Sequence, residues 1–332
     1  MNETPVQPPF EALQSLLSDE MSAVNALIQT RMASEHAPRI PEVSAHLINA
    51  GGKRLRPLLT LAVAKMCGYQ GDHHIKLAAT VEFIHTATLL HDDVVDESNQ
   101  RRGRPTANLL WDNKSSVLVG DYLFARAFQL MVETDSLRVL DILSNAAAVI
   151  AEGEVLQLSV AQSLKTTEDV YSQVIRGKTA ALFSAATEVG GVIAGEDETT
   201  VAALFAYGDA LGMSFQVVDD LLDYGGVSAQ MGKNIGDDFR ERKMSLPVIR
   251  AVAAATPAER DFWVRVIEKG DQRDGDLEAA LALMAKHGAL EGTRAQALDW
   301  AEKAKAALRP LPASTLRDHL ISLADFVVSR VT

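Results

Sequence analysis

Apolar residues recur at helical spacing along most of the chain. Segments 77–97, 136–162, 168–194 and 198–224 are long, rich in Ala and Leu, and free of proline. None shows the sustained polar–apolar alternation that predicts a half-buried strand. We therefore predict an all-α protein.

Helix boundaries are marked by residues that favour helix ends. Thr256, Pro257 and Glu259 form a capping box with proline at the first helical position. Gly225 and Gly226 are expected to end the fourth of these helical segments. Gly103 and Pro105 predict a break after position 97.

The chain shows no short-period repeat, low-complexity block or obvious linker, so we expect a disordered tail over residues 1–10 and one helical domain over 11–332. The start lacks the basic and apolar regions of a signal peptide, and no apolar run reaches the roughly 18 residues of a membrane span. Both features predict a cytoplasmic protein. Cys67 is the only cysteine, which excludes an intramolecular disulfide and a thiolate zinc cluster. The net charge of −12 argues against a general nucleic-acid binder.

Two apolar helical segments each carry three aspartates in a D-D-x-x-D pattern: Asp92, Asp93 and Asp96, and Asp219, Asp220 and Asp223. We call these the first and second acid trios. Like charges four residues apart on a helix repel by roughly 0.2–0.5 kcal/mol, and burying an unpaired carboxylate costs far more. If the two helices face each other, the carboxylates would line a cavity and bind a hard cation, with magnesium the default beside phosphates. The alternative is two sets of surface acids at solvated helix ends, which the repetition of the pattern in two apolar helices disfavours.

Basic clusters lie beside the acids in this acidic chain. They occur in the segments GGKRLRP (51–57), RRGRPTAN (101–108), GKTA (177–180) and GKNIGDDFRERK (232–243). Lys and Arg bind phosphates directly, so we expect one anion held through metal ions and another held by cations. Salt-bridge partners and solvated loop charges are the alternative explanation for single members of these clusters.

Taken in order, these segments together with EFIHTATLLHDDVVDE (82–97) and FQVVDDLLDY (215–224) resemble the trans-prenyl diphosphate synthases, and most closely their bacterial long-chain branch. The resemblance spans roughly residues 50 to 250. It implies an all-α bundle around a central cavity, a homodimer, and magnesium-dependent condensation of an allylic diphosphate with isopentenyl diphosphate. About three magnesium ions per active site, bound with the diphosphate, would stabilise the leaving group.

The resemblance also assigns roles residue by residue. Magnesium ligands would come from both acid trios, with Asp93 supporting Asp92 and Asp96, and with Asp220 and Asp223 acting directly or through water beside Asp219. Isopentenyl diphosphate would be bound by Lys53, Arg56, His85 and Arg102. The allylic diphosphate would be contacted by Arg101, Lys178 and Lys233, with Lys243 another basic residue near it and Asp238 a further acid. Thr179 and Gln216 would lie beside the reacting carbons.

Ala87 and Thr88, one turn before Asp92, are small where short-chain relatives carry aromatic rings. An open tunnel there predicts an octaprenyl-to-decaprenyl product for a quinone side chain. Phe83, Phe124 and Phe128 are candidates for its floor. A geranylgeranyl or other medium-chain product is the alternative.

Other classes fit the sequence less well. A terpene cyclase usually replaces the second trio, which is complete here. An HD-type phosphohydrolase would chelate a metal through His85 and His91, but these lie about 120° apart round a helix. A non-catalytic regulatory subunit usually loses part of an acid motif. We expect small-molecule diphosphates as partners, no nucleic acid, and at most peripheral membrane contact for product release.

Overall fold

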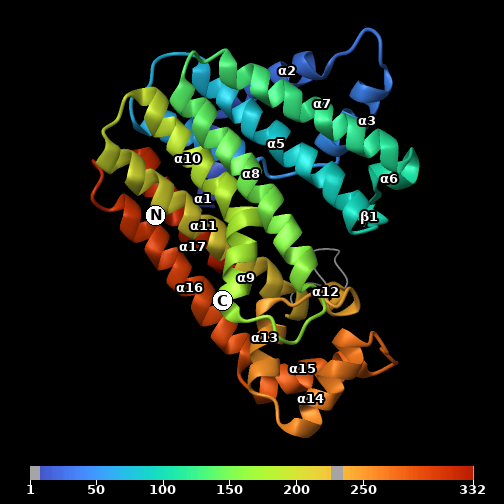
Figure 1. Cartoon of the computed structure of the whole chain (residues 1–332). Coiled ribbons are helices and arrows are strands. Elements are labelled where there is room, and N and C mark those ends of the chain that lie inside the picture. Colours follow the sequence, from blue (N-terminus) through green and yellow to red (C-terminus); the bar gives the residue numbers. More distant parts are fainter. Residues whose placement is uncertain (1–7, 226–234, 332) are drawn as a thin grey trace, which may run out of the picture. The chain divides into compact units, whose positions relative to one another are not determined.

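The computed structural model describes residues 8–225 and 235–331, and only the backbone of Asn49. Almost all of this part of the chain is helical (Figure 1). The prediction of an all-α protein is therefore confirmed.

The chain divides into two compact units. Unit 1 comprises the described parts of Met1–Ala147 together with Leu182–Phe205 and Leu311–Leu320. Unit 2 comprises the described parts of Ala148–Ala181, Ala206–Pro310 and Ile321–Thr332. The expectation of one domain over residues 11–332 stays a prediction. The first described helix begins at Pro9 and Phe10 is buried, so two residues of the segment expected to be a tail belong to a helix.

The elements of unit 1 are α1 (Pro9–Leu16), α2 (Ser18–Met32), α3 (Arg39–Asn49), α4 (Leu55–Met66), α5 (His73–Val95), β1 (Gln100–Arg101), β2 (Arg104–Pro105), α6 (Ala107–Leu110), α7 (Asn113–Val132) and nearly all of α10 (Ala181–Ala194). Those of unit 2 are α9 (Glu168–Ile175), the π-helical turn η1 (Arg176–Ala180), α12 (Asp237–Arg240), α13 (Leu246–Ala253), α14 (Pro257–Trp263), the π-helical turn η3 (Val264–Glu268), α15 (Asp276–Lys286) and α16 (Ala289–Leu308). Besides α10, whose first residue Ala181 belongs to unit 2, three helices have residues in both units: α8 (Leu137–Val160), α11 (Glu198–Tyr224) and α17 (Thr315–Val328).

The predicted helical segments match this order closely. Segment 77–97 falls on α5, 136–162 on α8, 168–194 on α9, η1 and α10, and 198–224 on α11. The capping box also forms, because the Thr256 side chain accepts from the Glu259 N–H while the Glu259 carboxylate accepts from the Thr256 N–H.

Each unit has its own apolar core. In unit 1, α5 packs against α2, α4 and α7 (Figure 1), and side chains on every side of it are buried. In unit 2, α13, α15 and α16 pack together, and buried Trp263 belongs to the same cluster. An apolar helix surrounded in this way is what the sequence pattern of α5 predicts.

The break after α5 contains a two-residue hairpin that the sequence pattern did not predict. Gln100 pairs with Pro105 and Arg101 with Arg104. Arg102 and Gly103 form the turn with φ of 53° and 73°, the conformation that a type I′ turn requires at both central positions. A strand of two residues is too short to show alternation, so only the turn residues could have indicated it.

Helix α11 is the one helix among the described residues that is long and apolar enough to cross a membrane. In its most apolar window, 61% of the helix is buried inside the protein. Burial of this kind is typical of a core helix.

Candidate active site

The first acid trio lies at the C-terminal end of α5 in unit 1. Asp92 and Asp93 belong to the last turn, and Asp96 is the C-cap, whose N–H donates to the Asp92 carbonyl at 2.8 Å. Helical spacing therefore continues to Asp96. Asp92 is half-buried and Asp96 is exposed, so this pair has access to solvent.

Asp93 has different surroundings from its two neighbours. Its side chain is fully buried, and one carboxylate oxygen accepts from Arg101 Nε at 2.9 Å and Nη2 at 2.8 Å. The other oxygen, Oδ2, is buried without a hydrogen-bond partner. Burial raises the pKa of Asp93, while the Arg101 guanidinium opposes that shift. Asp93 therefore supports the trio through Arg101, and its second oxygen remains available for a cation.

A cationic cluster lies on the same unit and includes the predicted residues Arg56, His85 and Arg102. The Arg56 Nη1 lies 3.3 Å from His85 Nε2, and its guanidinium stacks 4.5 Å from the centre of the Phe183 ring. Arg102 lies against Gly52, where a Cβ would come within 2.7 Å of Nη1. Burial, followed by the charges of Arg56 and Arg102, lowers the pKa of His85 well below its usual value. Burial, together with the charge of Arg102, also lowers the pKa of Arg56 to about 10. Such a shift is expected where cations lie close together without a bound anion.

Lys53 follows Gly52 in the loop that precedes α4. Its side chain is exposed, and its ammonium lies 5.9 Å from the centre of the Phe10 ring. The structure thus brings together Arg56, His85 and Arg102, and it places Lys53 next in the chain to Gly52, against which Arg102 lies.

Glu82 is a site residue that the sequence analysis did not single out. It is buried three residues before His85 and forms a short ion pair with Arg54. Burial raises the pKa of Glu82, and Arg54, Arg56 and Arg102 oppose that shift. The only sequence signal for Glu82 is an acid in an apolar helix at the spacing of one turn from His85.

The second acid trio lies in the last two turns of α11, in the part of this helix that belongs to unit 2. Asp220 is buried, and its oxygens accept from Tyr171 Oη at 2.7 Å and Gln216 Nε2 at 2.8 Å. Asp219 lies 3.9 Å from Arg330 Nη2, in α17's C-terminal extension. Asp223 Oδ2 accepts from the Asp238 N–H at 3.0 Å.

Carboxylates are crowded around this trio. Burial, and then the Asp219 charge, raises the pKa of Asp220 to about 6. Burial and the charges of Asp220 and Asp223 raise the pKa of Asp238 well above its usual value. Lys243 lies 3.8 Å from Asp238, and it also pairs with Glu241. Asp238 thus lies next to the second trio, and a cation would relieve the crowding of these carboxylates.

Lys178 and Thr179 lie in the π-helical turn η1 of unit 2. Thr179 Oγ1 donates to Gln216 Oε1 at 2.8 Å, so two residues predicted beside the reacting carbons are in contact. Lys178 Nζ lies 2.9 Å from Glu154 Oε2, and Glu154 Oε1 is buried without a partner. Neither Glu154 nor Tyr171 was singled out from the sequence, because their partners lie on other helices. Lys233 lies outside the described residues.

The donors present suit a hard divalent cation. Within residues 8–225 and 235–331, no three His, Cys, Asp or Glu side chains converge as ligands for one ion. Protein carboxylates could therefore supply only part of a coordination shell, and the rest would come from diphosphate and water, as magnesium prefers. The unpartnered Asp93 Oδ2 in unit 1 fits such an ion, and so, separately, do the crowded acids near Asp220 in unit 2.

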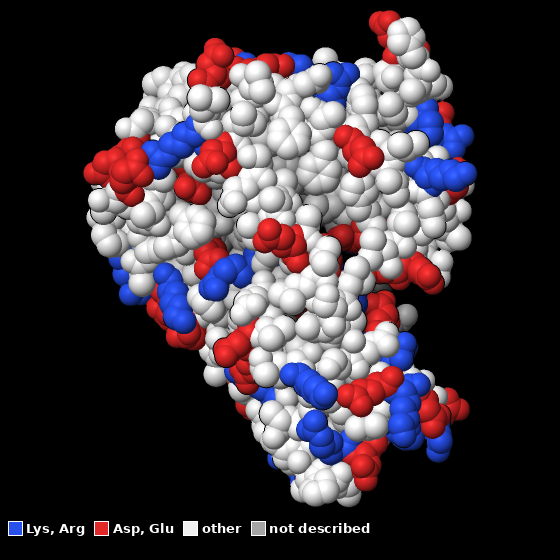
Figure 2. Space-filling model, viewed as in Figure 1, with Lys and Arg blue, Asp and Glu red and all other residues white. Residues whose placement is uncertain are grey.

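Outside these groups, charges of both signs are interspersed on the surface. Figure 2 shows this over the region that helices α13–α15 occupy in Figure 1. Many of these charges form pairs, such as Arg273 with Asp271 at 2.6 Å. Solvated pairs of this kind are typical surface features.

Comparison with known proteins identifies the family. Residues 37–284 match the Polyprenyl synthetase family. The chain is 45% identical over 321 residues to octaprenyl diphosphate synthase from Escherichia coli (strain K12), covering 97% of this chain and 99% of that protein. Its structure is similar to a decaprenyl diphosphate synthase from Rhodobacter capsulatus, with a TM-score of 0.95 and 71% identity over 97% of this chain and 99% of that one.

A third relative is a polyprenyl synthase from Caulobacter crescentus CB15, whose crystal structure is a complex with calcium and isoprenyl diphosphate. Its TM-score is 0.92 at 53% identity, and the match covers 97% of this chain and 98% of that one. With the cationic cluster and both acid trios in place, the chain belongs to the Polyprenyl synthetase family and is a prenyltransferase.

Proposed function

We propose that this enzyme extends an allylic diphosphate by successive additions of isopentenyl diphosphate to a long-chain all-trans polyprenyl diphosphate. The observation that carries the proposal is that the cationic cluster and the first acid trio both have residues on α5. His85 of the cationic cluster and Asp92 of the first trio are seven residues apart, two helical turns or about 10 Å along one face. One diphosphate would be bound directly by cations and the other through metal ions, which suits two diphosphate substrates held side by side.

We infer that the metal is magnesium, about three ions per active site, with ligands supplied by the acid trios. The donor chemistry supports this, and so does the calcium in the structure of the Caulobacter relative. When bound, magnesium would neutralise charge on the departing diphosphate. Asp220 contributes more through Gln216 than as a ligand, since both of its oxygens already accept hydrogen bonds.

The remaining residues act on the substrates. Lys53, Arg56, His85 and Arg102 hold isopentenyl diphosphate, and Arg101, Lys178, Lys233 and Lys243 contact the allylic diphosphate. The allylic C–O bond breaks as diphosphate leaves, and the double bond of isopentenyl diphosphate forms the new C–C bond. The proton lost in this step passes to diphosphate, so no protein base is required. Apolar walls keep water from the cation.

A product in the octaprenyl-to-decaprenyl range, for a quinone side chain, is favoured by Ala87. This small residue is fully buried on α5, five positions before Asp92, and an aromatic ring in its place would obstruct the path that we propose for the growing chain. The named products of the Escherichia coli and Rhodobacter capsulatus relatives fall in the same range. A geranylgeranyl product would need this space to be closed, and a regulatory subunit would not need two complete trios.

We infer a homodimer from an exposed apolar face on α6 and α7, made by Leu109, Leu110, Leu118, Phe128 and Val132. Such a patch is unusual on a soluble monomer and marks an interaction surface. The enzyme would be cytoplasmic and touch the membrane only where its apolar product leaves.

The test is incubation of purified enzyme with farnesyl and isopentenyl diphosphates, followed by chromatography of the dephosphorylated products. With magnesium we expect a ladder ending between eight and ten isoprene units, and none after chelation. Replacing Asp92 with Asn should lower the rate by about 100-fold or more, because a lost interaction with developing charge is worth several kcal/mol. No ladder with magnesium present would refute the proposal.

A further inference from the structure

A continuous chain of hydrogen bonds in unit 2 connects a buried tyrosine to the proposed reaction centre. Tyr171 Oη donates to Asp220 Oδ2 at 2.7 Å, Gln216 Nε2 donates to Asp220 Oδ1 at 2.8 Å, and Thr179 Oγ1 donates to Gln216 Oε1 at 2.8 Å. Tyr171 is 5% exposed and Thr179 is 5% exposed. The chain therefore starts in the core and ends at a residue that we place beside the reacting carbons.

The chemistry of the groups determines which atom donates and which accepts in each hydrogen bond. An ionised carboxylate can only accept, so Asp220 must receive the Tyr171 O–H and the Gln216 N–H. Because the Gln216 amide N–H faces Asp220, its carbonyl oxygen faces Thr179. The Thr179 hydroxyl therefore donates its single proton to Gln216 Oε1. The Thr179 oxygen keeps only lone pairs to offer elsewhere, and these attract positive charge.

The π-helical turn η1 makes the arrangement possible. Tyr171 and Thr179 are eight residues apart, which on a regular α-helix would separate them by about 80°. A π turn inserts one extra residue, so the two side chains lie as if seven residues apart, on one face. That face meets Gln216 and Asp220, which are themselves one turn apart on α11.

Neighbouring contacts hold Tyr171 in place. The Thr167 side chain caps α9 through the Val170 N–H at 3.3 Å. Arg250 of α13 donates two hydrogen bonds to the Glu168 carboxylate, from Nε at 3.0 Å and from Nη2 at 2.9 Å. The Tyr171 side chain is itself buried, and its hydroxyl donates to Asp220 Oδ2 at 2.7 Å, which fixes the orientation of the phenol.

We propose that Tyr171 is a positioning residue for prenyl transfer, acting through Asp220 and Gln216 to hold the Thr179 oxygen as an acceptor for the developing allylic cation. This inference rests on the proposed function. It predicts that the phenolic hydroxyl matters for the chemical step and that its effect passes through Thr179.

The experiment is a double-mutant cycle with Tyr171→Phe and Thr179→Val, measured by single-turnover condensation of farnesyl and isopentenyl diphosphates with magnesium. Tyr171→Phe should slow the step about tenfold, as expected for loss of a hydrogen bond to a charged group, with the KM for isopentenyl diphosphate unchanged. In the Thr179→Val background the same substitution should cost less than about twofold, because coupled residues are not additive. Tyr207→Phe is the matched control, since Tyr207 is likewise a buried tyrosine and lies in the unit 2 part of α11.

A purely structural role for Tyr171 would lower the melting temperature without slowing the step more than Tyr207→Phe does, and this result would overturn the inference. The inference would also be overturned if the rate loss of the double variant equalled the product of the losses of Tyr171→Phe and Thr179→Val, because the two residues would then act independently. If Tyr171→Phe does not fold, Asp220→Asn tests the same chain, because an amide cannot accept with both of its terminal atoms. Its cost should also disappear in the Thr179→Val background, whereas loss of a metal ligand would persist there. A wild-type enzyme that makes no polyprenyl product would refute the proposed function instead.

Discussion

The middle aspartates of the two trios, Asp93 and Asp220, are neutralised differently. Asp93 accepts from the permanent cation of Arg101, whereas Asp220 accepts from the neutral donors Tyr171 and Gln216. Ion pairing cancels most of the Asp93 charge, but neutral hydrogen bonds only spread the Asp220 charge over its donors. The two middle aspartates therefore differ in what they offer a metal ion: Asp93 has one buried oxygen without a hydrogen-bond partner, whereas both oxygens of Asp220 already accept hydrogen bonds.

Ala87 gives a residue-scale test of product length. Ala87→Phe should stop elongation early and shift the final product from eight or more isoprene units to about four or five. Overpacking this buried site should also cost roughly 1–3 kcal/mol of stability. The products are measured by chromatography at a temperature where the variant stays folded.

Ala78→Phe is the control for that substitution. Ala78 is equally buried on α5, and nine residues place it about 180° from Ala87 round the helix. It should destabilise the protein comparably and leave the product ladder unchanged. An unaltered ladder in Ala87→Phe would remove Ala87 from the tunnel wall.

At the residue scale, the sequence predicts which side chains take part but not their partners. The acid spacing and the cationic cluster with Arg56, His85 and Arg102 could be identified from local patterns. The contact between Tyr171 and Asp220 joins residues 49 positions apart, and that of Lys178 with Glu154 joins residues 24 apart. Such pairs depend on how helices pack, which no local pattern encodes.

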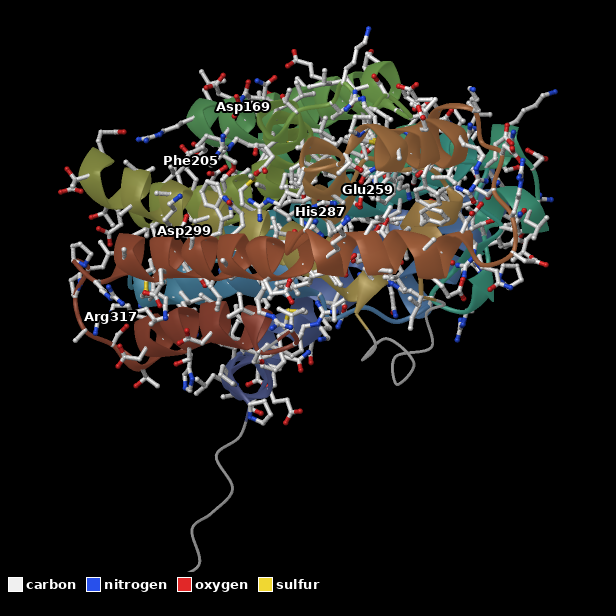
Figure 3. The ribbon with its side chains drawn as sticks, turned by 90° about the horizontal axis from the view of Figure 1, so that it is seen from below. Asp169, Phe205, Glu259, His287, Asp299 and Arg317 are labelled. Atoms are coloured by element: carbon white, nitrogen blue, oxygen red, sulfur yellow. The ribbon has the colours of Figure 1, made fainter. Side chains whose placement is uncertain are left out.

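At the element scale, the capping box of α14 should make the stability of unit 2 depend on pH. Hydrogen bonding to Lys286, followed by that to the Thr256 backbone, lowers the pKa of Glu259 to about 2. Figure 3 shows Glu259 beside His287, whose Nε2 lies 3.0 Å from Glu259 Oε2. Because the folded-state pKa lies below the ordinary value of 4.5, this stabilisation is present above pH 4.5 and is lost as the pH falls towards 2.

Glu259→Gln should therefore lower the melting temperature at pH 7, and the difference from wild type should shrink steadily between pH 4.5 and 2. Thermal unfolding followed by circular dichroism measures both quantities. Asp261→Asn, an exposed change on the same helix, should have little effect. A difference that stays constant over this pH range would show that the Glu259 charge is not responsible.

The close approach of α8 to η1 is a second element-scale feature with a measurable consequence. A Cβ on Gly153 would come within 2.8 Å of the Lys178 backbone nitrogen, and one on Gly177 within 2.9 Å of the Gly153 Cα. Gly153→Ala should force the two backbones apart, displace Lys178, and cost roughly 1–3 kcal/mol. We expect a lower denaturant midpoint together with a raised KM for the allylic diphosphate.

A matched control for Gly153→Ala is Gly195→Ser, at the end of α10. No heavy atom lies within 4 Å of a Cβ built on Gly195, but its φ of +78° adds backbone strain. That variant should lose stability without a change in KM. If both glycine variants raise KM equally, the contact between α8 and η1 does not position Lys178.

Helix identity was predictable because the apolar pattern of α5, α8 and α11 persists over many turns. The π-helical turn η1 was not, since one extra residue within segment 168–194 leaves the local composition helical. The capping box could be predicted because all its partners lie within four residues. Elements follow from local chemistry, whereas irregularities such as η1 depend on the contacts that the helix makes elsewhere.

At the scale of the whole molecule, the apolar face of α6 and α7 predicts association with a second copy. Leu118 is 66% exposed and Val132 is 61% exposed. Residues 118, 121, 125, 128 and 132 recur every three or four positions and so form one stripe, which is apolar apart from Asp121. Packing this stripe against the same stripe of a second copy would bury apolar surface that is exposed to water in the monomer. Each Å² buried would stabilise the dimer by roughly 25 cal/mol.

Leu118→Lys should weaken the dimer, because two added ammonium groups would be desolvated in the interface. We expect the dissociation constant to rise about tenfold or more, since truncating or charging a central residue typically costs more than 1 kcal/mol. Light scattering after size exclusion, over a dilution series, measures the change in mass. Leu298→Lys on α16 is the control, an exposed leucine outside the stripe, and it should leave the mass unchanged. A wild-type chain that elutes as a monomer at micromolar concentration would contradict the dimer, and equal masses for Leu118→Lys and wild type would move the interface away from α7.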